Sequence, residues 1–578
     1  MALVHFVRQH CTIEVENGIT LLKAAQLAKV VVESPCNGMG TCGKCRVLLP
    51  DAESRANVRY ESAQHKISEQ DKAAGWVLAC QTTVWGDVNV DAESTAAKNK
   101  TLKILDEGKS FSYELRPAYT KRYDGVCTHA LCSSEELGTE EGDTTAQQYG
   151  LSIDIGTTTV VTALVDLRDG RELASVSSLN PQSLQAQDVL TRIHFASKPV
   201  GLKQMYDSIT EELSRMIADA AQKAGVETRY IYEAVYSGNT AMIHLATNVN
   251  PESLGRFPYT PMIRGGNQIS AQMLGISPFG RIYLPPIISS YVGPDITSGV
   301  LASQLNRQKG TVLFIDIGTN GEMVIARDGS LSATSTAAGP AFEGMNITNG
   351  MRAAAGAVEY FRVEDDGNIT VRTIGNATAV GICGSGLLDV VGELVHAGAI
   401  GSNGRFVPPE KGTYYDSIKA RMTQYEGKPA FDVADGVVLT QKDVRQVQLA
   451  KGAIRAGIEA LLLNEHVLAQ EVDRVEIAGS FGYHLREESL IHLGLLPESF
   501  TGKVAFVGNT SKSGGKAFLL NTRLREEMLG VTSKIDSVEL SNRDDFQKIF
   551  VDALKFRPLG GLHNAGGVLR GKDSHGFA

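Results

Sequence analysis

Four cysteines near the start of the chain have the residue type and the spacing of metal ligands. Five residues separate Cys36 from Cys42, two separate Cys42 from Cys45, and Cys80 follows at a distance. Cysteine thiolates spaced C-x4-C-x2-C with a remote fourth cysteine hold [2Fe-2S] clusters, and this run differs only by one residue in its first gap. The spacing therefore predicts a [2Fe-2S] cluster and one-electron transfer.

Zinc and disulfide bonds are the alternative uses of these cysteines. Zinc sites usually pair two C-x2-C units, whereas this run has one, and disulfide frameworks suit short secreted chains. The other cysteines lie outside the pattern: Cys11, Cys127, Cys132 and Cys383. We expect the first and the last of these to be ordinary buried residues. The middle two could bind a metal but have no second pair.

The loop that carries three of the ligands needs unusual backbone angles, because all three must wrap around one cluster. Glycine supplies such angles without strain, and the loop contains Gly38, Gly40 and Gly43. Upstream, residues 3–7 and 11–15 are predicted to be two strands of a hairpin, and Thr20 could cap a short helix. This order of elements resembles the β-grasp fold of ferredoxins, and the five-residue first gap between the cysteines resembles that of ferredoxins of the adrenodoxin type.

Composition limits the function classes. A chain of 578 residues has several domains, and a hydrophobic content of 43% is ample for large cores. The 56 basic and 65 acidic residues give a net charge of −9, which argues against nucleic acid as a partner. Apolar stretches are of strand length and interrupted by charges, so we expect no membrane partner. With no targeting pattern at the start, we expect a cytoplasmic protein.

Residues 93–148 are predicted to be a linker that follows a ferredoxin-like domain at residues 1–92. Residues 93–104 are small and polar, residues 133–143 are acidic, and one strand is expected near residues 112–115. A flexible chain of about 50 residues reaches roughly 40 Å, which would let an electron-carrying domain swing between a donor and an acceptor. An ordered strap packed on the next domain is the alternative.

The rest of the chain contains an internal repeat. The segment LSIDIGTTT at residues 151–159 recurs as LFIDIGTNG at residues 313–321. Each copy is an apolar strand, an aspartate and a tight glycine turn with hydroxyl or amide side chains. Such a turn presents backbone N–H groups to an anion, and the aspartate can hold hydrated Mg²⁺ beside it. Two facing copies would clasp the phosphates of a nucleotide between halves at residues 149–310 and 311–578.

The repeat predicts two sets of residues for a nucleotide-binding site. The phosphates would contact Gly156, Thr157, Thr158, Gly318, Thr319 and Asn320. Asp154 and Asp316 would serve Mg²⁺ or the attacking water, and Glu343 is a further candidate for a catalytic carboxylate. Asp295 is another carboxylate candidate, although capping of a helix is the simpler role for it.

The two copies resemble the phosphate motifs of the superfamily of acetate and sugar kinases, heat-shock chaperones and actin. A third segment, VEIAGSFG at residues 475–482, resembles the adenosine motif of that superfamily. The resemblance implies ATP as the ligand, with Gly479 and Ser480 beside adenosine. It implies an α/β multidomain chain in which a β-grasp ferredoxin domain and a linker precede a duplicated RNase H-like ATPase domain of the actin and sugar kinase type.

Other nucleotide motifs are not matched. The segment GNTSKSGGKA at residues 508–517 lacks the glycine at position 510 and the serine or threonine at position 517 that a P-loop needs. We predict a turn before a helix there. We find no convincing G-x-G-x-x-G fingerprint after a strand, which predicts no built-in NAD or FAD site. The electrons should therefore come from an external low-potential donor.

A ferredoxin joined to such an ATPase resembles the family of reductive activators of corrinoid proteins. The resemblance extends to residues 237–244, 338–344, 350–353 and 383–387. In that family ATP drives an electron from the iron–sulfur cluster to the cobalt of a corrinoid protein, and inactive cobalt(II) returns to cobalt(I) for methyl transfer. The resemblance implies a corrinoid protein of a methyltransferase or O-demethylase system as the partner, and a homodimer.

Two other functions stay open. A small-molecule kinase of the sugar and acetate kinase superfamily could carry the ferredoxin as a redox sensor, and its ATP turnover would respond to a sugar or acyl substrate. A non-catalytic electron carrier would use the ATPase-like half only for docking and would hydrolyse nothing. Thr348 and Ser385 lie in glycine-rich loops and could reach the corrin of a partner.

Overall fold

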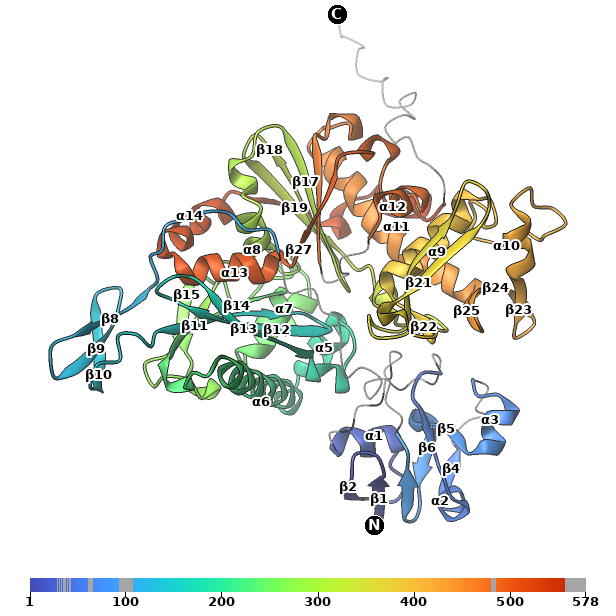
Figure 1. The fold of residues 1–578 in the computed structure, drawn as a ribbon, viewed down its shortest axis with the longest axis horizontal. Coiled ribbons are helices and arrows are strands. Elements are labelled where there is room, and N and C mark those ends of the chain that lie inside the picture. The colour runs from blue at the N-terminus through green and yellow to red at the C-terminus, as the bar shows by residue number, and fades with distance from the viewer. Residues whose placement is uncertain are drawn as a thin grey trace, which may run out of the picture.

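The computed structural model describes residues 1–28, 30, 32, 34, 38, 40, 43–60, 66–92, 108–479 and 485–556. A small N-terminal domain lies beside a larger body that contains two six-stranded sheets (Figure 1). Within the described ranges, no helix combines the length and the apolar character needed to cross a membrane.

The N-terminal domain has the predicted β-grasp order. Strands β1 (Ala2–Phe6) and β2 (Cys11–Val15) form an antiparallel hairpin, and β7 (Val88–Val90) joins β1 in parallel. Thr20 caps α1 (Leu21–Leu27), since its side chain accepts a hydrogen bond of 3.2 Å from the backbone N–H of Lys23, as predicted. The other elements are β3 (Arg46–Leu48), α2 (Ala52–Ala56), β4 (Val58–Tyr60), α3 (Glu69–Ala74), β5 (Trp76–Leu78) and β6 (Thr82–Val84).

An ordered strap follows, which is the alternative that the sequence left open. The backbone N–H of Lys109 donates to the carbonyl of Val507 at 2.7 Å, and that of Arg116 donates to the carbonyl of Leu520 at 2.7 Å. The strand predicted near residues 112–115 does not form. Its backbone hydrogen bonds instead fasten residues 108–116 to the second half of the body.

A three-stranded sheet, here called the arm, stands where a linker was predicted. Its strands are β8 (Tyr119–Tyr123), β9 (Cys127–Cys132) and β10 (Glu135–Glu141), in the order β10-β9-β8. One of the acidic residues that suggested a linker has partners within the fold. Glu140 accepts a hydrogen bond of 2.7 Å from Lys121 and another from Tyr232. The prediction of a linker over residues 93–148 is therefore wrong for residues 108–148, and residues 93–107 lie outside the described part.

The two halves of the body repeat one topology. The first sheet has the order β13-β12-β11-β14-β16-β15 and the second the order β27-β26-β17-β18-β19-β28. In each, three antiparallel strands formed by consecutive residues are extended by two parallel strands, so β11 corresponds to β17 and β14 to β26. The first set is β11 (Tyr149–Ile155), β12 (Thr159–Asp166), β13 (Glu172–Leu179), β14 (Ile231–Gly238), β15 (Asn267–Ser270) and β16 (Arg281–Leu284). The second set is β17 (Thr311–Ile317), β18 (Gly321–Arg327), β19 (Ser330–Thr336), β26 (Arg474–Ala478), β27 (Val504–Gly508) and β28 (Asp536–Ser537).

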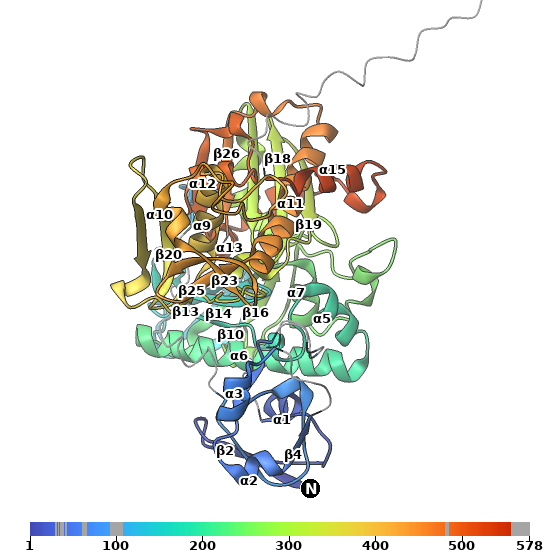
Figure 2. The same cartoon turned by 90° about the vertical axis from the view of Figure 1, so that its right-hand side faces the viewer.

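Helices cover both sheets, and small sheets extend the second half. The first half carries α5 (Val189–Ala196), α6 (Pro199–Ala224), α7 (Thr240–Ala246) and α8 (Pro294–Ala302). The second half carries α9 (Gly384–His396), α10 (Asp416–Arg421), α11 (Gln441–Asn464), α12 (Glu487–His492), α13 (Thr510–Leu520), α14 (Thr522–Thr532) and α15 (Phe546–Ala553). Its added strands are β20 (Ala357–Val363), β21 (Ile369–Thr373), β22 (Gly381–Ile382), β23 (Met422–Tyr425), β24 (Lys428–Ala434) and β25 (Val437–Thr440). Figure 2 shows the N-terminal domain at the end of the molecule near α6.

Helix α13 belongs to the second half in sequence but packs on the sheet of the first half. The hydroxyl of Ser152 in β11 donates to the carbonyl of Lys512 in α13 at 2.8 Å. A Cβ atom on Gly514 would lie 2.0 Å from the carbonyl oxygen of Ser298 in α8, so only glycine allows α8 and α13 to approach so closely. The turn before a helix predicted at residues 508–517 is confirmed, since α13 begins directly after β27.

Helix α14 fastens the same junction with a buried ion pair. Arg525 donates two hydrogen bonds, of 2.8 and 2.6 Å, to the carboxylate of Glu233 in β14. The Glu233 side chain is fully buried and that of Arg525 is 9% exposed. A bidentate guanidinium–carboxylate pair fixes geometry as well as charge, so this pair sets how the second half sits on the first.

Replacement of Arg525 by methionine should destabilise the protein strongly. The variant leaves the Glu233 carboxylate buried without its cation, and breaking a buried pair in this way costs about 3–5 kcal/mol. Urea unfolding followed by circular dichroism measures the loss. Arg523→Met on the same helix is the control, because Arg523 is exposed and should lose less than about 1 kcal/mol. Equal effects of the two variants would contradict the structural role of the pair.

Candidate functional site

The two repeated loops face each other across one cavity. The hydroxyl oxygens of Thr158 and Thr319, one from each loop, lie 3.3 Å apart. Both loops follow the end of a central strand, β11 in the first half and β17 in the second. The structure therefore brings together the two copies of the repeat. The residues that line the cavity include Gly156, Thr157, Thr158, Gly318, Thr319, Asn320, Asp154, Asp316, Glu343 and Gly479.

Each aspartate at the end of a central strand lies near the start of a helix from the opposite half. Asp154 accepts hydrogen bonds from Asn509 at 2.9 Å and from Ser511 at 2.7 Å, and these two residues begin α13. Asp316 is close enough to Asp295, in the first turn of α8, for the two charges to interact. The positive end of a helix favours negative charge, so both helix starts stabilise an anionic cavity.

A pair of equivalent glycines, Gly238 and Gly479, lies beside the ends of the two central strands. Ile155 in β11 pairs with Gly238 in β14, and Gly479 follows β26 at the corresponding place beside Ile317. A Cβ atom would lie 2.6 Å from the carbonyl oxygen of Ile155 at Gly238, and 2.3 Å from that of Ile317 at Gly479. Both positions therefore require glycine. Gly479 also has a φ of +118°, and Ser480, predicted to accompany it, lies outside the described residues.

The carboxyl groups in the cavity resist ionisation. Desolvation, assisted by the charge of Asp154, raises the pKa of Asp316 to about 7. Desolvation and the charge of Asp316 raise the pKa of Asp295 to about 8. Desolvation also raises the pKa values of Asp154 and Glu322, against the hydrogen bonds that Ser511 and Asn320 give to their ionised forms. The cavity therefore holds more negative charge than it can stabilise by itself.

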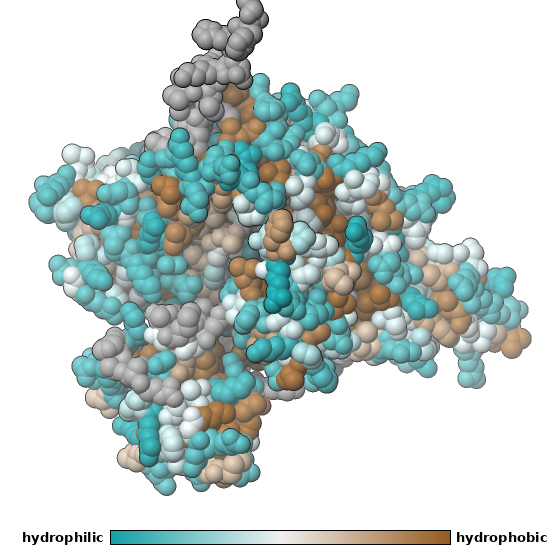
Figure 3. Space-filling model, turned by 180° about the vertical axis from the view of Figure 1, so that it is seen from behind, coloured by the Kyte–Doolittle hydropathy of each residue, from teal (hydrophilic) through white to brown (hydrophobic). Residues whose placement is uncertain are grey.

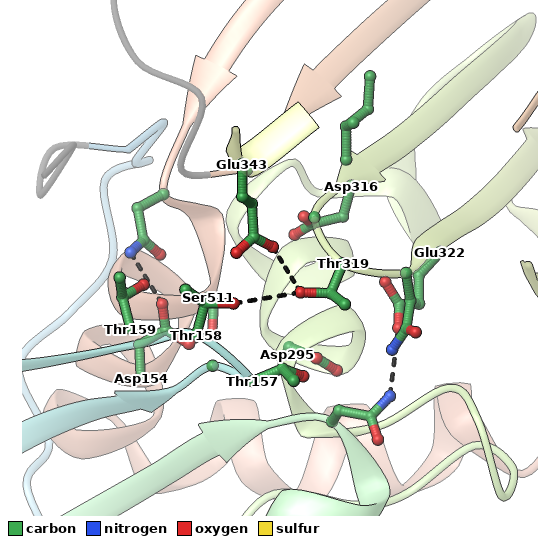
Figure 4. A pocket seen from close by; sticks show the side chains of 17 residues that line it. Asp154, Thr157, Thr158, Thr159, Asp295, Asp316, Thr319, Glu322, Glu343 and Ser511 are labelled. Carbon is green, nitrogen blue, oxygen red and sulfur yellow. Dashed lines mark hydrogen bonds between the residues drawn. The ribbon is translucent and has the colours of Figure 1, made fainter. Parts of the chain in front are cut away.

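The donor set of this cavity fits a divalent cation bound with phosphates. Five carboxylates line it, and none of its lining residues in the described ranges is a lysine or an arginine. One oxygen of Glu343, Oε2, is buried without a hydrogen-bond partner, while Oε1 accepts from Thr319 (Figure 4). A polyphosphate could not approach these carboxylates unless a cation lay between them. Mg²⁺ prefers such oxygen ligands together with waters and phosphates.

The structure adds residues that the repeat did not identify. Arg192 is fully buried and donates to the carbonyl of Thr157 at 2.7 Å, and Asn180 donates to the carbonyl of Gly156 at 2.8 Å, so both hold the first loop from behind. The lining also includes Asn239, Glu322, Asn509 and Ser511. Glu322 directly follows the second copy of the repeat, a position that the sequence could have indicated. Asn239 lies in residues 237–244 and Asn509 and Ser511 lie in residues 508–517, segments that the sequence singled out without assigning these side chains to the nucleotide site.

Two residues proposed to reach a partner have internal roles. The hydroxyl of Ser385 donates to the carbonyl of Glu359 at 3.0 Å and the side chain is buried. The hydroxyl of Thr348 donates to Asp443 at 3.0 Å. Asp295 does not cap its helix, since Gly293 occupies that position; its carboxylate accepts from the N–H of Ile296 at 2.9 Å and lines the cavity.

The described part of the cysteine loop fits a metal cluster. The sulfur atoms of Cys45 and Cys80 lie 3.2 Å apart, and the hydrogen bond from Cys45 lowers the pKa of the Cys80 thiol to about 6. Thiolates are the form that binds metal. Gly38, Gly40 and Gly43 have φ values of +84°, +72° and +72°, which confirms the predicted left-handed conformations. Cys36 and Cys42 lie outside the described residues.

The cluster loop contacts the body, and the N-terminal domain touches both halves. The ammonium group of Lys44, next to Cys45, donates to the carbonyls of Ile347 and Thr348 in the second half, the latter at 3.0 Å. In the first half, the carbonyl of Leu184 accepts a hydrogen bond of 2.6 Å from Gln26. The segment that Lys44 contacts lies a few residues after Glu343, which accepts a hydrogen bond from Thr319 in the second repeated loop.

Fold and site thus define an iron–sulfur protein with an actin-like ATPase domain, and comparison with known proteins agrees. The model of the 2Fe-2S iron-sulfur cluster binding domain matches residues 4–84. The model of the RACo middle region matches residues 149–308, and that of the C-terminal domain of RACo, the ASKHA domain, matches residues 310–560. The fold class predicted from the sequence is confirmed, apart from its linker.

Similar proteins act on corrinoid proteins according to their names. The corrinoid activation enzyme RamQ of Eubacterium limosum is 35% identical over 68% of this chain and 66% of its own length. The [Co(II) methylated amine-specific corrinoid protein] reductase of Methanosarcina barkeri is 23% identical over 71% of this chain and 77% of its own length. A solved structure titled reductive activator for corrinoid, iron-sulfur protein aligns with a TM-score of 0.70 and 30% identity, over 97% of this chain and 99% of that one. The chain belongs to the RACo family of reductive activators.

The stability of the nucleotide-free protein should fall as pH rises from about 4 to 7. The pKa of Asp316 is raised in the folded protein to about 7 from its ordinary value of 3.8, so between these values the folded state binds more protons than the unfolded state. Stability then decreases with pH by up to about 1.4 kcal/mol per pH unit for one proton. Asp316→Asn should flatten this slope in urea unfolding at several pH values, whereas Asp207→Asn on the exposed face of α6 should not. An unchanged slope for Asp316→Asn would contradict the raised pKa.

Proposed function

We propose that this protein uses ATP to drive the one-electron reduction of cobalt in a partner corrinoid protein, from inactive cobalt(II) to cobalt(I). The observation that carries the proposal is the direct contact between the cysteine loop and the segment that follows Glu343 beside the phosphate loops. This contact joins an electron-transfer site to a nucleotide cavity in one chain. The names of the relatives supply the class of partner.

The energetics explain why ATP would be needed. Plant-type [2Fe-2S] clusters have potentials near −400 mV, and cobalt(I) corrinoids are still stronger reductants. Each ~59 mV uphill reduces the equilibrium constant for one electron tenfold, which is ~1.4 kcal/mol. A gap of roughly 100–200 mV thus needs roughly 2–5 kcal/mol. An external low-potential donor would supply one electron to the chain, and cobalt(II) of the partner would finally accept it.

In this proposal the two loops hold Mg·ATP between the halves. Backbone N–H groups and hydroxyls of Gly156, Thr157, Thr158, Gly318, Thr319 and Asn320 would contact the phosphates, and Gly479 with Ser480 would lie beside adenosine. Asp154, Asp316 and Glu343 would hold Mg²⁺ or orient the attacking water. The raised pKa of Asp316 supports this role, because a cation would stabilise the ionised carboxylate.

The thiolates of four residues would hold a [2Fe-2S] cluster, whose iron atoms would store one electron: Cys36, Cys42, Cys45 and Cys80. Binding of ATP would draw the halves together around the phosphates. Since Gln26 contacts the first half and Lys44 the second, such closure would alter the position of the N-terminal domain. A ligand shifts such an equilibrium only by its differential affinity for the two states, so ATP must bind the closed state more tightly.

Finer features of the system are also proposed. The partner would belong to a methyltransferase or O-demethylase system, and the chain would act as a homodimer, as the family resemblance implies. Thiolate ligands suit a reducing compartment, which supports a cytoplasmic location. The alternative function, a small-molecule kinase with a ferredoxin redox sensor, predicts ATP turnover that responds to sugars or acyl compounds.

Mixing the reduced, anaerobic protein with a cobalt(II) corrinoid protein should produce the cobalt(I) absorption band only when Mg·ATP is present. The expected result is ATP-dependent growth of that band with a matching release of phosphate. Several corrinoid proteins should be tried as acceptors. If none is reduced while the cluster is reduced and ATP is bound, the kinase alternative is favoured.

Asp316→Asn should abolish this reduction while leaving the cluster intact. Loss of the carboxylate removes a ligand of the proposed cation and should lower ATP turnover by about 100-fold or more. The visible spectrum of the cluster should not change, because its ligands lie in another domain. Asp207→Asn serves as the control. Undiminished turnover in Asp316→Asn would remove this residue from the mechanism.

Lys44→Met should loosen the N-terminal domain. The variant removes the hydrogen bonds to Ile347 and Thr348, so the radius of gyration from small-angle X-ray scattering should increase and ATP should stimulate cobalt reduction less. Lys23→Met, on an exposed face of the same domain, should change neither. Unchanged scattering and unchanged ATP stimulation in Lys44→Met would show that the contact does not couple the domains.

A further inference from the structure

A group of potential metal ligands lies in the arm, away from both the cysteine loop and the nucleotide cavity. Asp124 Oδ2 lies 2.9 Å from His129 Nε2 and 3.7 Å from Cys127 Sγ. The sulfur lies 3.8 Å from the same imidazole nitrogen. Three different donor atoms, a carboxylate oxygen, a thiol sulfur and a ring nitrogen, therefore converge on one point.

We propose that Asp124, Cys127 and His129 form a binding site for one divalent transition-metal ion of the zinc class. Protein ligands bind zinc at about 2.3 Å for sulfur, about 2.05 Å for nitrogen and about 2.0 Å for oxygen. A tetrahedral ion then places sulfur about 3.5 Å from the other two atoms and nitrogen about 3.3 Å from oxygen. The separations in the arm differ from these by a few tenths of an ångström.

The backbone of the arm positions the three side chains. Asp124 Oδ1 accepts hydrogen bonds from the N–H groups of Val126, at 2.8 Å, and Cys127, at 2.9 Å, which turns Oδ2 towards the other ligands. Cys127 and His129 are two residues apart on β9 and so share one face of the sheet. No side chain needs to cross the sheet to complete the site.

A carboxylate lies behind the histidine, on the side where metal-binding histidines usually have an outer-sphere partner. Glu136 Oε1 in β10 lies 3.0 Å from His129 Nδ1, the ring nitrogen that faces away from the proposed ion. The negative charge of Glu136 at this distance favours a proton on Nδ1, which leaves Nε2 able to bind metal. A simple ion pair with His129 requires one carboxylate. The arm places two beside this ring, Asp124 near Nε2 and Glu136 near Nδ1.

The chemistry of the donors selects the ion. Thiolate and imidazole ligands favour zinc and related transition metals over Mg²⁺ and Ca²⁺, which prefer oxygen. With Asp124 and Cys127 ionised and His129 neutral, a divalent ion gives the site a net charge of zero. Three protein ligands leave a fourth position for water. Val126 in the adjoining turn is 80% exposed, and the arm stands out from the body (Figure 3), so solvent reaches the site.

Cys132 does not belong to this site, although the sequence suggested a pair with Cys127. The two residues lie at opposite ends of β9, five positions apart, so they point to opposite faces. At about 3.4 Å per residue they are about 17 Å apart. Cys132 therefore offers a matched control on the same strand.

The test uses the full-length protein with its iron–sulfur cluster assembled. After incubation with zinc and desalting, mass spectrometry should find one zinc per chain, and zinc K-edge X-ray absorption should show one sulfur and three nitrogen or oxygen neighbours. In competition with a chromophoric chelator, Cys127→Ser and His129→Gln should each weaken zinc binding by at least tenfold. Glu136→Gln should weaken it about 10- to 100-fold, and Cys132→Ser should leave it unchanged.

Two outcomes would overturn the proposal. The wild type could retain no more zinc than a variant with both Cys127→Ser and His129→Gln. The contact between Asp124 and His129 would then be an ion pair beside the Cys127 thiol, and the arm would hold no metal site. If X-ray absorption shows three or more sulfur neighbours, the zinc occupies the cysteines of the cluster loop instead. Because absorption is measured on the wild type, the second conclusion does not depend on the folding of a variant, and circular dichroism of the double variant verifies its fold for the first.

Discussion

Uncompensated negative charge in the central cavity is the constraint on which the rest of the structure depends. Five carboxylates meet there, and the described lining contains no basic side chain to neutralise them. The fold tolerates this charge through hydrogen bonds to Asp154 from the start of α13, and by holding some of the carboxyl groups protonated. In the proposed function, Mg²⁺ bound with the phosphates would replace these protons and neutralise the carboxylates.

The crossing of helices between the halves makes that cavity a shared structure. Each central aspartate lies near a helix start from the opposite half, so neither half forms the site alone. Gly514 lets α13 approach α8 closely, and the Arg525–Glu233 pair fastens α14 to the first sheet. The two halves therefore share a common helical core in which α8 packs on α13 beside the cavity.

The N-terminal domain completes this arrangement by contacting both halves. Its contact through Lys44 lies next to Cys45, a proposed cluster ligand, at one end and a few residues from Glu343 at the other. A few residues thus connect the second repeated loop to the cysteine loop. Glu343 contacts that loop, and Lys44 contacts the segment that follows Glu343 in the chain. In the proposed function, this proximity links ATP binding to electron transfer without a long chain of intermediate residues.

The sequence by itself determined the features that are encoded locally. The cysteine spacing, the left-handed glycines, the cap at Thr20 and both copies of the repeat could be recognised because each depends on residues that are neighbours in the chain. The arm was missed because its acidic residues resemble a linker until their partners, such as Lys121 for Glu140, are known.

Only the tertiary structure decided which residues complete the site. Asn509 and Ser511 donate hydrogen bonds to Asp154, although they lie more than 350 positions away in the sequence. Arg192, in helix α5, donates a hydrogen bond to the carbonyl of Thr157. No periodicity or motif signals such contacts, since they follow from how the two sheets and their crossing helices pack. Short motifs in the sequence indicate the chemistry of the site, because each motif consists of neighbouring residues. The assembly of these motifs into one cavity depends on the packing of the whole chain.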